Sequence, residues 1–338
     1  MKGPFLMTKI ETIMTHEYPD FDCLYSVYLL RKFGQTKYPG IREAALQFVP
    51  AESIPEDQNG QQLLEQGTLA LDLHRGYYDH HEELDNDRST ARIVAQDLNI
   101  EEDPCLQKIL DFVDQNDLHG VSIQSRRAVD QLICIPNIIK GLNLKYKDDY
   151  AKVYHVCEEM FEAAYMNERD WFLAIDDIQK GSSHKIGNIK ILSFSSASKA
   201  SAKAGRYCQG DLCVIQGEAL TYNFTTRRSK RWPEPDLTRL AKVIRLAEGL
   251  RAGHPIDEKN LNCIGTFEDW FLHQSRVFFS RGSFKKTDVP PSLLSLHELF
   301  QLAIFCFDPQ PKFLGSFSEH FDQFKQVLHT PMTSQLRQ

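Results

Sequence analysis

Residues 9–33 read KIETIMTHEYPDFDCLYSVYLLRKF and contain the signals that decide the fold of the first part of the chain. Residues 9–14 have the pattern of a short strand. Pro19 disfavours a helical conformation at the residue before it, so residues 15–22 predict a loop. Apolar residues then recur at helical spacing over 23–33, and Gly34 supplies a stop signal. The sequence therefore predicts a strand, an acidic loop and a helix in succession.

The following residues repeat this alternation of strands and helices. We predict strands at 46–49 and 68–73 and helices at 60–66 and 89–98, the last with Ser89 or Asp87 as its N-cap. Strands and helices at this spacing are typical of a parallel α/β sheet. Residues 103–180 are mainly helical in pattern, and Gly181-Ser182-Ser183 is the best candidate for a linker.

A different pattern follows this linker. We predict strands at 188–194, 212–216 and 220–226, helices at 200–207 and 237–250, and a hairpin-like interval at 217–219. The predicted fold class is α/β, with a parallel-sheet domain and a second, smaller α+β domain across a cleft. The expected boundaries are 1–180 for the first domain with its helical connector, 184–312 for the second domain and 313–338 for a C-terminal tail.

The composition is that of an ordinary globular protein. Of the 338 residues, 42% are hydrophobic and 25% are charged, which argues against a disordered, collagen-like or coiled-coil chain. The N-terminal residues lack the apolar run of a signal peptide, and no apolar stretch approaches the roughly 20 residues of a membrane helix. We therefore expect a cytoplasmic protein with no membrane partner. Eight cysteines without a Cys-x-x-Cys pair predict reduced, mostly buried thiols.

Charge is distributed unevenly along the chain. The formal net charge of −7 argues, as a single number, against a nucleic-acid partner. Between His184 and Trp232, however, nine Lys or Arg residues and two acidic residues give +7, which leaves −14 elsewhere. A basic segment beside an acidic remainder suits a substrate with several phosphates. The alternative is a solvated turn, the more common role of a charge run.

Acidic and histidine residues gather at four places in the first domain: His16, Asp20 and Asp22; Asp72; Asp79, His80 and His81; Asp114 and Asp117. The first two places lie at predicted strand ends, where open α/β sheets bind ligands. Carboxylates this close repel one another unless a cation lies between them. Carboxylate and imidazole ligands without a thiolate favour Mg²⁺- or Mn²⁺-like ions, and this many ligands suit two ions roughly 3.5–4 Å apart.

These residues resemble the motifs of the DHH phosphoesterase superfamily, which includes nanoRNase-like and RecJ-like domains. His16-x-x-Pro19-Asp20-x-Asp22 is similar to the first motif, Asp72 to the second, Asp79-His80-His81 to the third, and Asp114 or Asp117 to the fourth. The resemblance implies two divalent cations, Mn²⁺ with Mg²⁺ or Co²⁺ as alternatives. The implied metal ligands are His16, Asp20, Asp22, Asp72, His80 and one of Asp114 and Asp117. Spacing alone does not choose between these two; Asp114 is the preferred ligand and Asp117 the further candidate. Asp79 and His81 are the implied catalytic residues: Asp79 would orient a histidine and His81 would face the scissile phosphate.

The second domain carries a less specific resemblance. Residues 225–229, a helix started by Asp236 and the loop 251–254 are similar to a DHH-associated substrate domain, which implies that Arg228 and His254 contact substrate phosphate or ribose. Only Gly253 remains of the glycine run expected before that histidine, although glycine permits the closest backbone approach to a phosphate. Further aromatic and basic residues follow at 270–286. The substrate-binding candidates are Ser89, Arg227, Arg228, His254, His273 and Arg281.

The leading hypothesis for function is a divalent-metal-dependent phosphodiesterase or exonuclease that hydrolyses short single-stranded oligonucleotides or dinucleotides. One alternative keeps the fold and changes the substrate to a small phosphate compound: a cyclic dinucleotide, an adenosine bisphosphate or pyrophosphate. A second alternative is a non-catalytic binding protein that retains a metal site. The expected partner is an oligonucleotide or nucleotide substrate, and a homodimer is left open.

Overall fold

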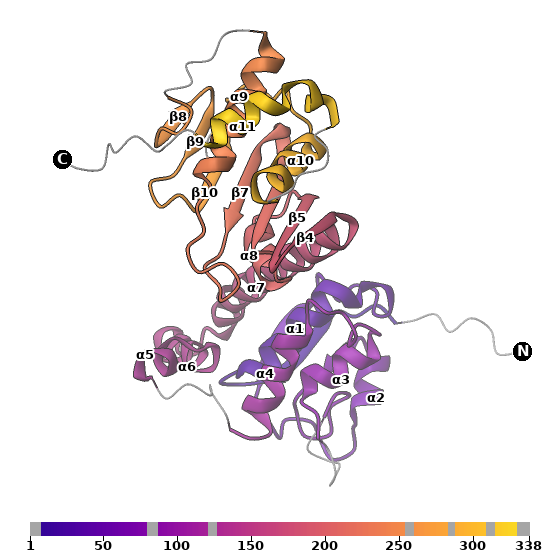
Figure 1. Cartoon of the computed structure of the whole chain (residues 1–338). Helices are drawn as coiled ribbons and strands as arrows, with labels where there is room; N and C mark the ends of the chain where they lie inside the picture. The colour runs from indigo at the N-terminus through magenta and orange to yellow at the C-terminus, as the bar shows by residue number, and fades with distance from the viewer. Residues whose placement is uncertain are drawn as a thin grey trace, which may run out of the picture. The chain divides into compact units, whose positions relative to one another are not determined.

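The computed structural model of the protein describes residues 8–79, 87–120, 127–253, 260–282, 288–308 and 315–329. The chain divides into two compact units, Met1–Glu168 and Arg169–Gln338, and the division falls inside the long helix α7 (Tyr150–Lys180). Figure 1 shows the elements of each unit. Within the described ranges, no helix combines the length and the apolar character that a membrane crossing requires.

The first unit contains a three-stranded parallel sheet, which confirms the predicted parallel α/β pattern. Strand β1 (Thr12–His16) lies between β2 (Ala45–Val49) and β3 (Thr68–Ala70). The strand predicted at 9–14 is thus shifted toward its carboxyl end, because the ladder with β2 continues until His16 pairs with Val49. Both partners of β1 run parallel to it, so the carboxyl ends of all three strands meet at one edge.

Helices α1 (Phe21–Phe33), α3 (Thr90–Asp97) and α4 (Gln107–Asp117) pack together, α1 against both others. Asp20 is the N-cap of α1, and Ser89 is the N-cap of α3, as one of the two predicted alternatives. The remaining helices of this unit are η1 (Gly34–Thr36), α2 (Gly60–Glu65), α5 (Ala128–Ile133) and α6 (Ile135–Tyr146).

The second unit is built on a seven-stranded mixed sheet in the order β4-β5-β6-β7-β10-β9-β8. Its strands are β4 (Ser182–Ile186), β5 (Ile189–Ser195), β6 (Leu212–Gln216), β7 (Tyr222–Thr226), β8 (Gly265–Phe267), β9 (Trp270–Leu272) and β10 (Phe278–Arg281). The linker predicted at 181–183 is wrong, because Ser182 and Ser183 begin β4 and pair antiparallel with β5. The strands β8–β10 have only three or four residues each, too few for a clear alternation of apolar and polar residues, so the sequence pattern does not predict them.

Apolar side chains cover both faces of this sheet. On one face, Ile191, Val214 and Phe224 join a core with α9 (Thr238–Ala252), α10 (Leu296–Phe307) and α11 (Phe321–His329). On the other face, Phe194 and Ile215 pack with Ile178 of α7 and with α8 (Ser201–Tyr207). Two short helices, η2 (Glu218–Leu220) and η4 (Gly315–His320), complete the described elements. The alternation of successive strand residues between two cores follows from the period of two in a strand.

Candidate functional site

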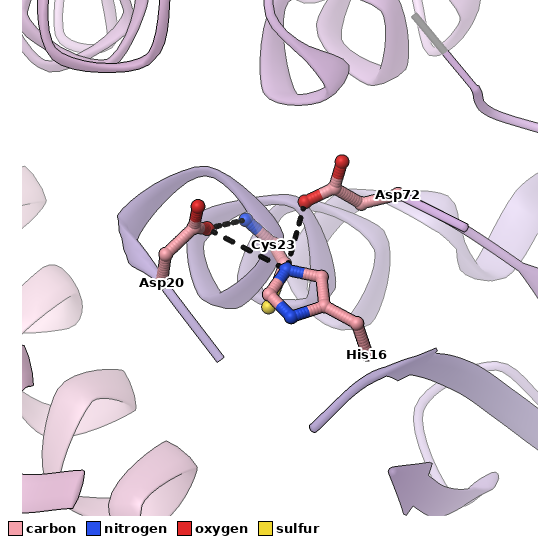
Figure 2. Close-up of side chains that lie close together, drawn as sticks. All are labelled: His16, Asp20, Cys23 and Asp72. Atoms are coloured by element: carbon pink, nitrogen blue, oxygen red, sulfur yellow. Dashed lines mark hydrogen bonds and ion pairs between the residues drawn. The ribbon is translucent and has the colours of Figure 1, made fainter. Parts of the chain in front are cut away.

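A cluster of ligand-type side chains lies at the carboxyl edge of the parallel sheet. His16 is the last residue of β1, Asp72 follows β3, and Asp20 and Cys23 lie at the start of α1. One nitrogen, oxygen or sulfur atom from each of these four residues lies within 4.8 Å of each of the others. Figure 2 shows the four side chains converging on a common region. This convergence is what a shared metal ion requires of its ligands.

Individual distances show how closely the cluster is held. His16 Nε2 lies 3.1 Å from Asp72 Oδ2 and 3.9 Å from Asp20 Oδ1. The other ring nitrogen of His16, Nδ1, is 2.8 Å from the carbonyl oxygen of Glu17, a contact that fixes the ring orientation. The Asp72 side chain is only 5% exposed, whereas that of Asp20 is 53% exposed. Solvent therefore reaches the cluster from the side of Asp20.

Asp22 lies behind this cluster and binds the N-terminus of α3. One carboxylate oxygen accepts the backbone N–H of Thr90 at 2.8 Å, and the other accepts that of Ala91 at 2.7 Å. Asp22 is almost fully buried. Because a helix N-terminus favours negative charge, α3 stabilises the Asp22 carboxylate beside the cluster.

The pKa values of the cluster reflect crowded negative charge. Although the Asp20 side chain is half exposed, the protein packed around it and the Asp72 carboxylate raise its pKa; burial and the Asp72 carboxylate raise the pKa of Asp22 well above its usual value. Burial by itself lowers the pKa of His16, but hydrogen bonding to Asp72 and other groups outweighs it and raises the pKa to about 12. A protonated imidazole thus partly balances the carboxylates. A divalent cation would provide the same compensation with more charge.

The backbone beside the cluster is strained at two non-glycine positions. Asp72 has φ 51° and Tyr18 has φ 53°, both in the left-handed region that costs about 1–3 kcal/mol per residue. The backbone N–H of Asp72 donates to the carbonyl of Tyr78 at 2.8 Å, which holds the turn in place. Both strained residues follow the carboxyl end of a strand. Strain of this kind clusters at functional sites, where geometry is more important than local stability.

Cys23 is the member of the cluster that the sequence analysis missed. Its side chain is fully buried, and burial raises the pKa of its thiol to about 11 although His16 opposes this effect. A ligand set without sulfur favours Mg²⁺- or Mn²⁺-like ions, and the thiol of Cys23 in the cluster weakens that preference. The N-cap residue and the third residue of a helix face the same side. The spacing of Asp20 and Cys23 was therefore the sequence signal that Cys23 lies beside Asp20.

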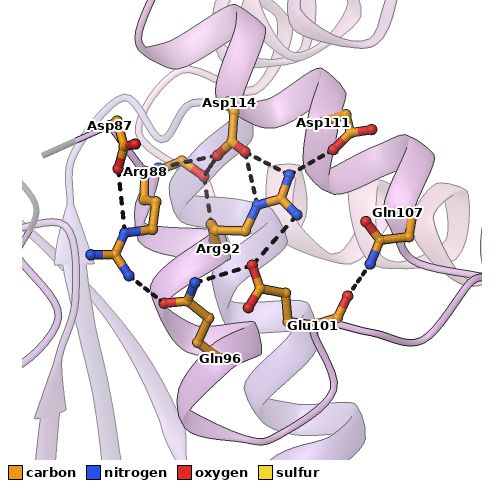
Figure 3. A network of polar contacts seen from close by, with 9 residues as sticks. Asp87, Arg88, Arg92, Gln96, Glu101, Gln107, Asp111 and Asp114 are labelled. Atoms are coloured by element: carbon orange, nitrogen blue, oxygen red, sulfur yellow. Dashed lines mark hydrogen bonds and ion pairs between the residues drawn. The ribbon is translucent and has the colours of Figure 1, made fainter.

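The structure places the fourth-motif candidates in different surroundings. Asp114 accepts from the Ser89 hydroxyl at 2.6 Å and from Arg92 Nε at 2.8 Å, and Figure 3 shows it within the Arg92 network. Asp111 also pairs with Arg92, at 2.8 Å. Asp117, one helical turn beyond Asp114, raises the pKa of Asp22, although burial and the carboxylates of Asp72 and Asp20 have larger effects.

The third motif is only partly described. Asp79 accepts a hydrogen bond from the backbone N–H of Arg75 at 2.8 Å. His80 and His81 lie outside the described residues, so the predictions of a metal ligand and a catalytic residue there stay predictions. Ser89, predicted as a substrate-binding residue, caps α3 and bonds Asp114, and its side chain is fully buried.

The second-unit candidates differ in how accessible they are. Arg228 is exposed, and Arg227 is partly exposed beside Asp211. His273 begins the turn between β9 and β10, where its Nδ1 lies 2.7 Å from the Ser275 hydroxyl. Arg281 is buried, pairs with Glu248 at 3.3 Å and donates to the carbonyl of Pro290 at 2.9 Å. Its guanidinium is therefore used within the unit. His254 lies outside the described residues.

No protein-family model matches this sequence, and comparison with curated proteins finds no significant match. The resemblance to the DHH phosphoesterases therefore depends on the motif residues themselves. The geometry at the end of β1 and β3 is the independent observation that bears on it.

Proposed function

We propose that this protein is a divalent-metal-dependent phosphodiesterase that hydrolyses short single-stranded oligonucleotides or dinucleotides. The observation that carries the proposal is the convergence of His16, Asp20 and Asp72 at the carboxyl edge of a parallel sheet. These residues come from two motifs far apart in the sequence, and they meet where α/β sheets bind ligands. Crowded carboxylates in one such place are a ready site for divalent cations.

The described donors fit divalent metal ions. We assign His16, Asp20, Asp22 and Asp72 as ligands, with His80 as a further ligand predicted from the motif. We choose Asp117 over Asp114 as the fourth-motif ligand, because Asp114 is bonded to Ser89 and Arg92 whereas Asp117 acts electrostatically on Asp22.

Each described residue has a role in preparing the site. The contact between His16 Nδ1 and the Glu17 carbonyl directs Nε2 toward Asp72 and Asp20. The hydrogen bond from Cys23 N–H to Asp20 Oδ1, at 3.0 Å, orients that carboxylate. Two bound divalent ions would supply a water of lowered pKa and would neutralise charge on the reacting phosphate. Asp79 and His81 keep their proposed roles of orienting a histidine and facing the scissile phosphate.

The charge of the second unit supports a substrate with more than one phosphate. The segment from His184 to Trp232 carries a net +7, and its Lys199, Lys203, Arg228, Lys230 and Arg231 are exposed. Several cations on one segment attract a polyanion more strongly than a single phosphate. This distribution favours an oligonucleotide over pyrophosphate or a bisphosphate.

The test is a turnover assay with the full chain and Mn²⁺, Mg²⁺ or Co²⁺. The substrates are RNA and DNA oligonucleotides of graded length, linear and cyclic dinucleotides, adenosine bisphosphate and pyrophosphate. The proposal predicts hydrolysis of short single strands that requires metal. Asp72→Asn should abolish it while preserving the fold, since asparagine also tolerates the left-handed conformation of this position. Asp57→Asn, at an exposed position, is the matched control.

Hydrolysis restricted to pyrophosphate, a bisphosphate or a cyclic dinucleotide would contradict the proposed oligonucleotide substrate and support a small phosphate compound instead. Metal binding without any turnover would favour the non-catalytic alternative. Full activity in Asp72→Asn would refute the assigned site.

A further inference from the structure

The register of the second sheet brings three basic segments to one end of adjacent strands. Ile191 of β5 pairs with Leu212 of β6, which in turn pairs with Thr226 of β7. Lys190 at the start of β5, the residues that precede β6 and Arg227 just after β7 therefore lie together. Helix α8 ends at Tyr207 and a short connection leads to β6 at Leu212, so the last turn of α8 lies near this same end.

Three cationic side chains bind carbonyl groups at the carboxyl end of α8 and just beyond it. Arg227 Nη1 donates to the carbonyl of Arg206 at 3.1 Å. Lys190 Nζ donates to that of Cys208 at 3.0 Å, and Arg231 Nη2 donates to that of Gln209 at 3.1 Å. A helix C-terminus favours cations, so these contacts hold the three groups in fixed positions around residue 207.

An exposed aromatic residue lies within the segment whose carbonyl groups bind these cations. Tyr207 is 73% exposed, and its ring packs edge-to-face against Trp171 with a centroid distance of 5.3 Å. Lys203, one turn earlier on α8, places its Nζ 5.3 Å from the centroid of the Trp171 ring. A single exposed tyrosine is ordinary. Tyr207 is supported by Trp171, three cations bind the carbonyl groups of the residues around it, and a fourth cation lies over Trp171, which together form a specific combination.

One acidic side chain, Asp211, compensates part of this charge through ion pairs with Arg231 at 3.2 Å and Arg227 at 3.7 Å. Asp211 is fully buried beneath the basic groups, where it accepts from Lys190 N–H at 3.0 Å and from the Ser229 hydroxyl at 3.1 Å. Asp170 is used by backbone N–H groups, those of Lys199 and Ala200. Glu218 follows the opposite end of β6. The outer surface at this end of the sheet is therefore cationic.

We propose that this end of the sheet binds single-stranded nucleic acid, with a base stacked on Tyr207 and the neighbouring phosphates held by the cations. The Tyr207 surface consists of Trp171, Lys190, Lys203, Tyr207, Arg227 and Arg231. Aromatic platforms flanked by backbone-binding cations are the usual means of holding single strands without sequence preference. A duplex keeps its bases within the stack, so it does not offer a free base to Tyr207.

The choice of a nucleic acid over another polyanion rests in part on the proposed function, because an oligonucleotide is the substrate inferred for the metal site. The Tyr207 surface, in the second unit, would be an additional binding place for that same substrate. Stacking of a base on Tyr207 distinguishes this surface from a purely electrostatic one, which would bind any polyanion.

The test is fluorescence anisotropy with the full chain and a 5′-labelled single-stranded oligonucleotide, in EDTA so that no hydrolysis occurs. RNA and DNA versions are compared with a duplex, an abasic oligonucleotide, polyphosphate and an acidic peptide. Tyr207→Ala should weaken single-strand binding by about five- to a hundredfold, whereas Tyr207→Phe should stay within about twofold of the wild type. Lys203→Gln should lower the slope of log affinity against log salt by about 0.7.

Leu220→Ala is the matched control, since it removes an exposed apolar side chain at the opposite end of β6 and should leave binding unchanged. Equal binding of the abasic strand, polyphosphate or the acidic peptide would overturn the proposal, as would wild-type affinity in Tyr207→Ala. Tyr207-dependent binding without metal-dependent hydrolysis would refute the proposed function and support this surface. Metal-dependent hydrolysis together with unchanged binding in Tyr207→Ala would support the proposed function and refute this surface.

Discussion

His16 Nε2 lies 3.1 Å from Asp72 Oδ2, and the two residues are 56 positions apart in the chain. The ladder between β1 and β3 has this same offset, since Thr12 pairs with Thr68 and Met14 with Ala70. The contact is therefore the continuation of a parallel register beyond the last paired residues. A slip of one residue would turn one side chain to the other face of the sheet and abolish the contact. The strand register thus sets the geometry of the candidate metal site.

The Asp20 carboxylate should lower the stability of the metal-free protein. Burial and Asp72 raise the pKa of Asp20, so its ionised form disfavours the folded state at neutral pH, and stability rises as the pH falls through that raised pKa. Asp20→Asn keeps the N-cap of α1, because asparagine caps as well as aspartate. The variant should therefore unfold at a higher temperature than the wild type in EDTA at neutral pH, and the difference should shrink in acid.

The same variant should lose the stabilisation that metal gives to the wild type. Thermal unfolding with and without Mn²⁺ measures both effects, and Asp57→Asn should change neither. A metal-induced shift of the same size in Asp20→Asn would contradict the assignment of Asp20 as a ligand.

Asp114 and Asp117 should fail in different ways when each is replaced by asparagine. Arg92 is nearly buried and pairs with Asp114 at 2.6 Å, so Asp114→Asn should lower the free energy of unfolding by about 2–4 kcal/mol. The metal affinity of the Asp114→Asn variant should stay close to that of the wild type. Asp117→Asn should instead weaken metal binding by at least about tenfold with a smaller effect on folding. Chemical unfolding and metal titration separate the two outcomes, and the opposite pattern would restore Asp114 as the ligand.

The sequence predicted the parts of the fold that depend on local pattern. The strand after residue 67, the helix capped by Ser89 and the strand at 212–216 are confirmed, because apolar periodicity and cap residues act within a few positions. The linker at 181–183 was wrong because Gly-Ser-Ser is typical of a linker by composition, whereas its pairing with β5 is a property of the folded sheet.

The sequence could predict those site residues whose position follows from the local pattern of strands and loops. Strand ends predicted that His16 and Asp72 lie at the same edge, and the structure brings them together. The roles of Asp114 and Arg281 depend on partners far away in the sequence: Arg92 for the first and Glu248 for the second. Spacing gives no information on such pairs, so a basic or acidic residue in a motif-like segment can be a buried structural group.

Cys23 should contribute a sulfur ligand when cobalt is bound. Its thiol lies in the cluster with His16, Asp20 and Asp72, and thiolates bind Co²⁺ and Zn²⁺ better than Mn²⁺ or Mg²⁺. The Co²⁺ protein should show the near-ultraviolet sulfur-to-cobalt absorption band, and Cys23→Ser should remove it and shift relative affinity toward Mn²⁺. Cys105→Ser, at another buried cysteine of the same unit, should retain the band. Absence of the band in the wild type would exclude sulfur ligation.

The acid sensitivity of the first unit should depend on Asp97, which ends α3. Tyr38 OH donates to Asp97 Oδ2 at 2.8 Å, and Tyr78 OH and Lys37 Nζ also bind this carboxylate. Burial alone would raise the pKa of Asp97, but these three partners outweigh it and lower the pKa below the ordinary value of 3.8. A depressed pKa stabilises the fold above 3.8, and this contribution is lost as the pH falls through the folded-state value.

Asp97→Asn should therefore lower the free energy of unfolding by about 2 kcal/mol at neutral pH, the typical contribution of hydrogen bonds to a charged group. The difference from the wild type should narrow once the pH falls below about 4, because the wild-type carboxylate is then protonated too. Urea unfolding across this pH range measures it, with the exposed Asp57→Asn as the control. A difference that stays constant into acid would mean that Asp97 stabilises the fold through shape and neutral hydrogen bonds, because only the ionised carboxylate makes the effect depend on pH.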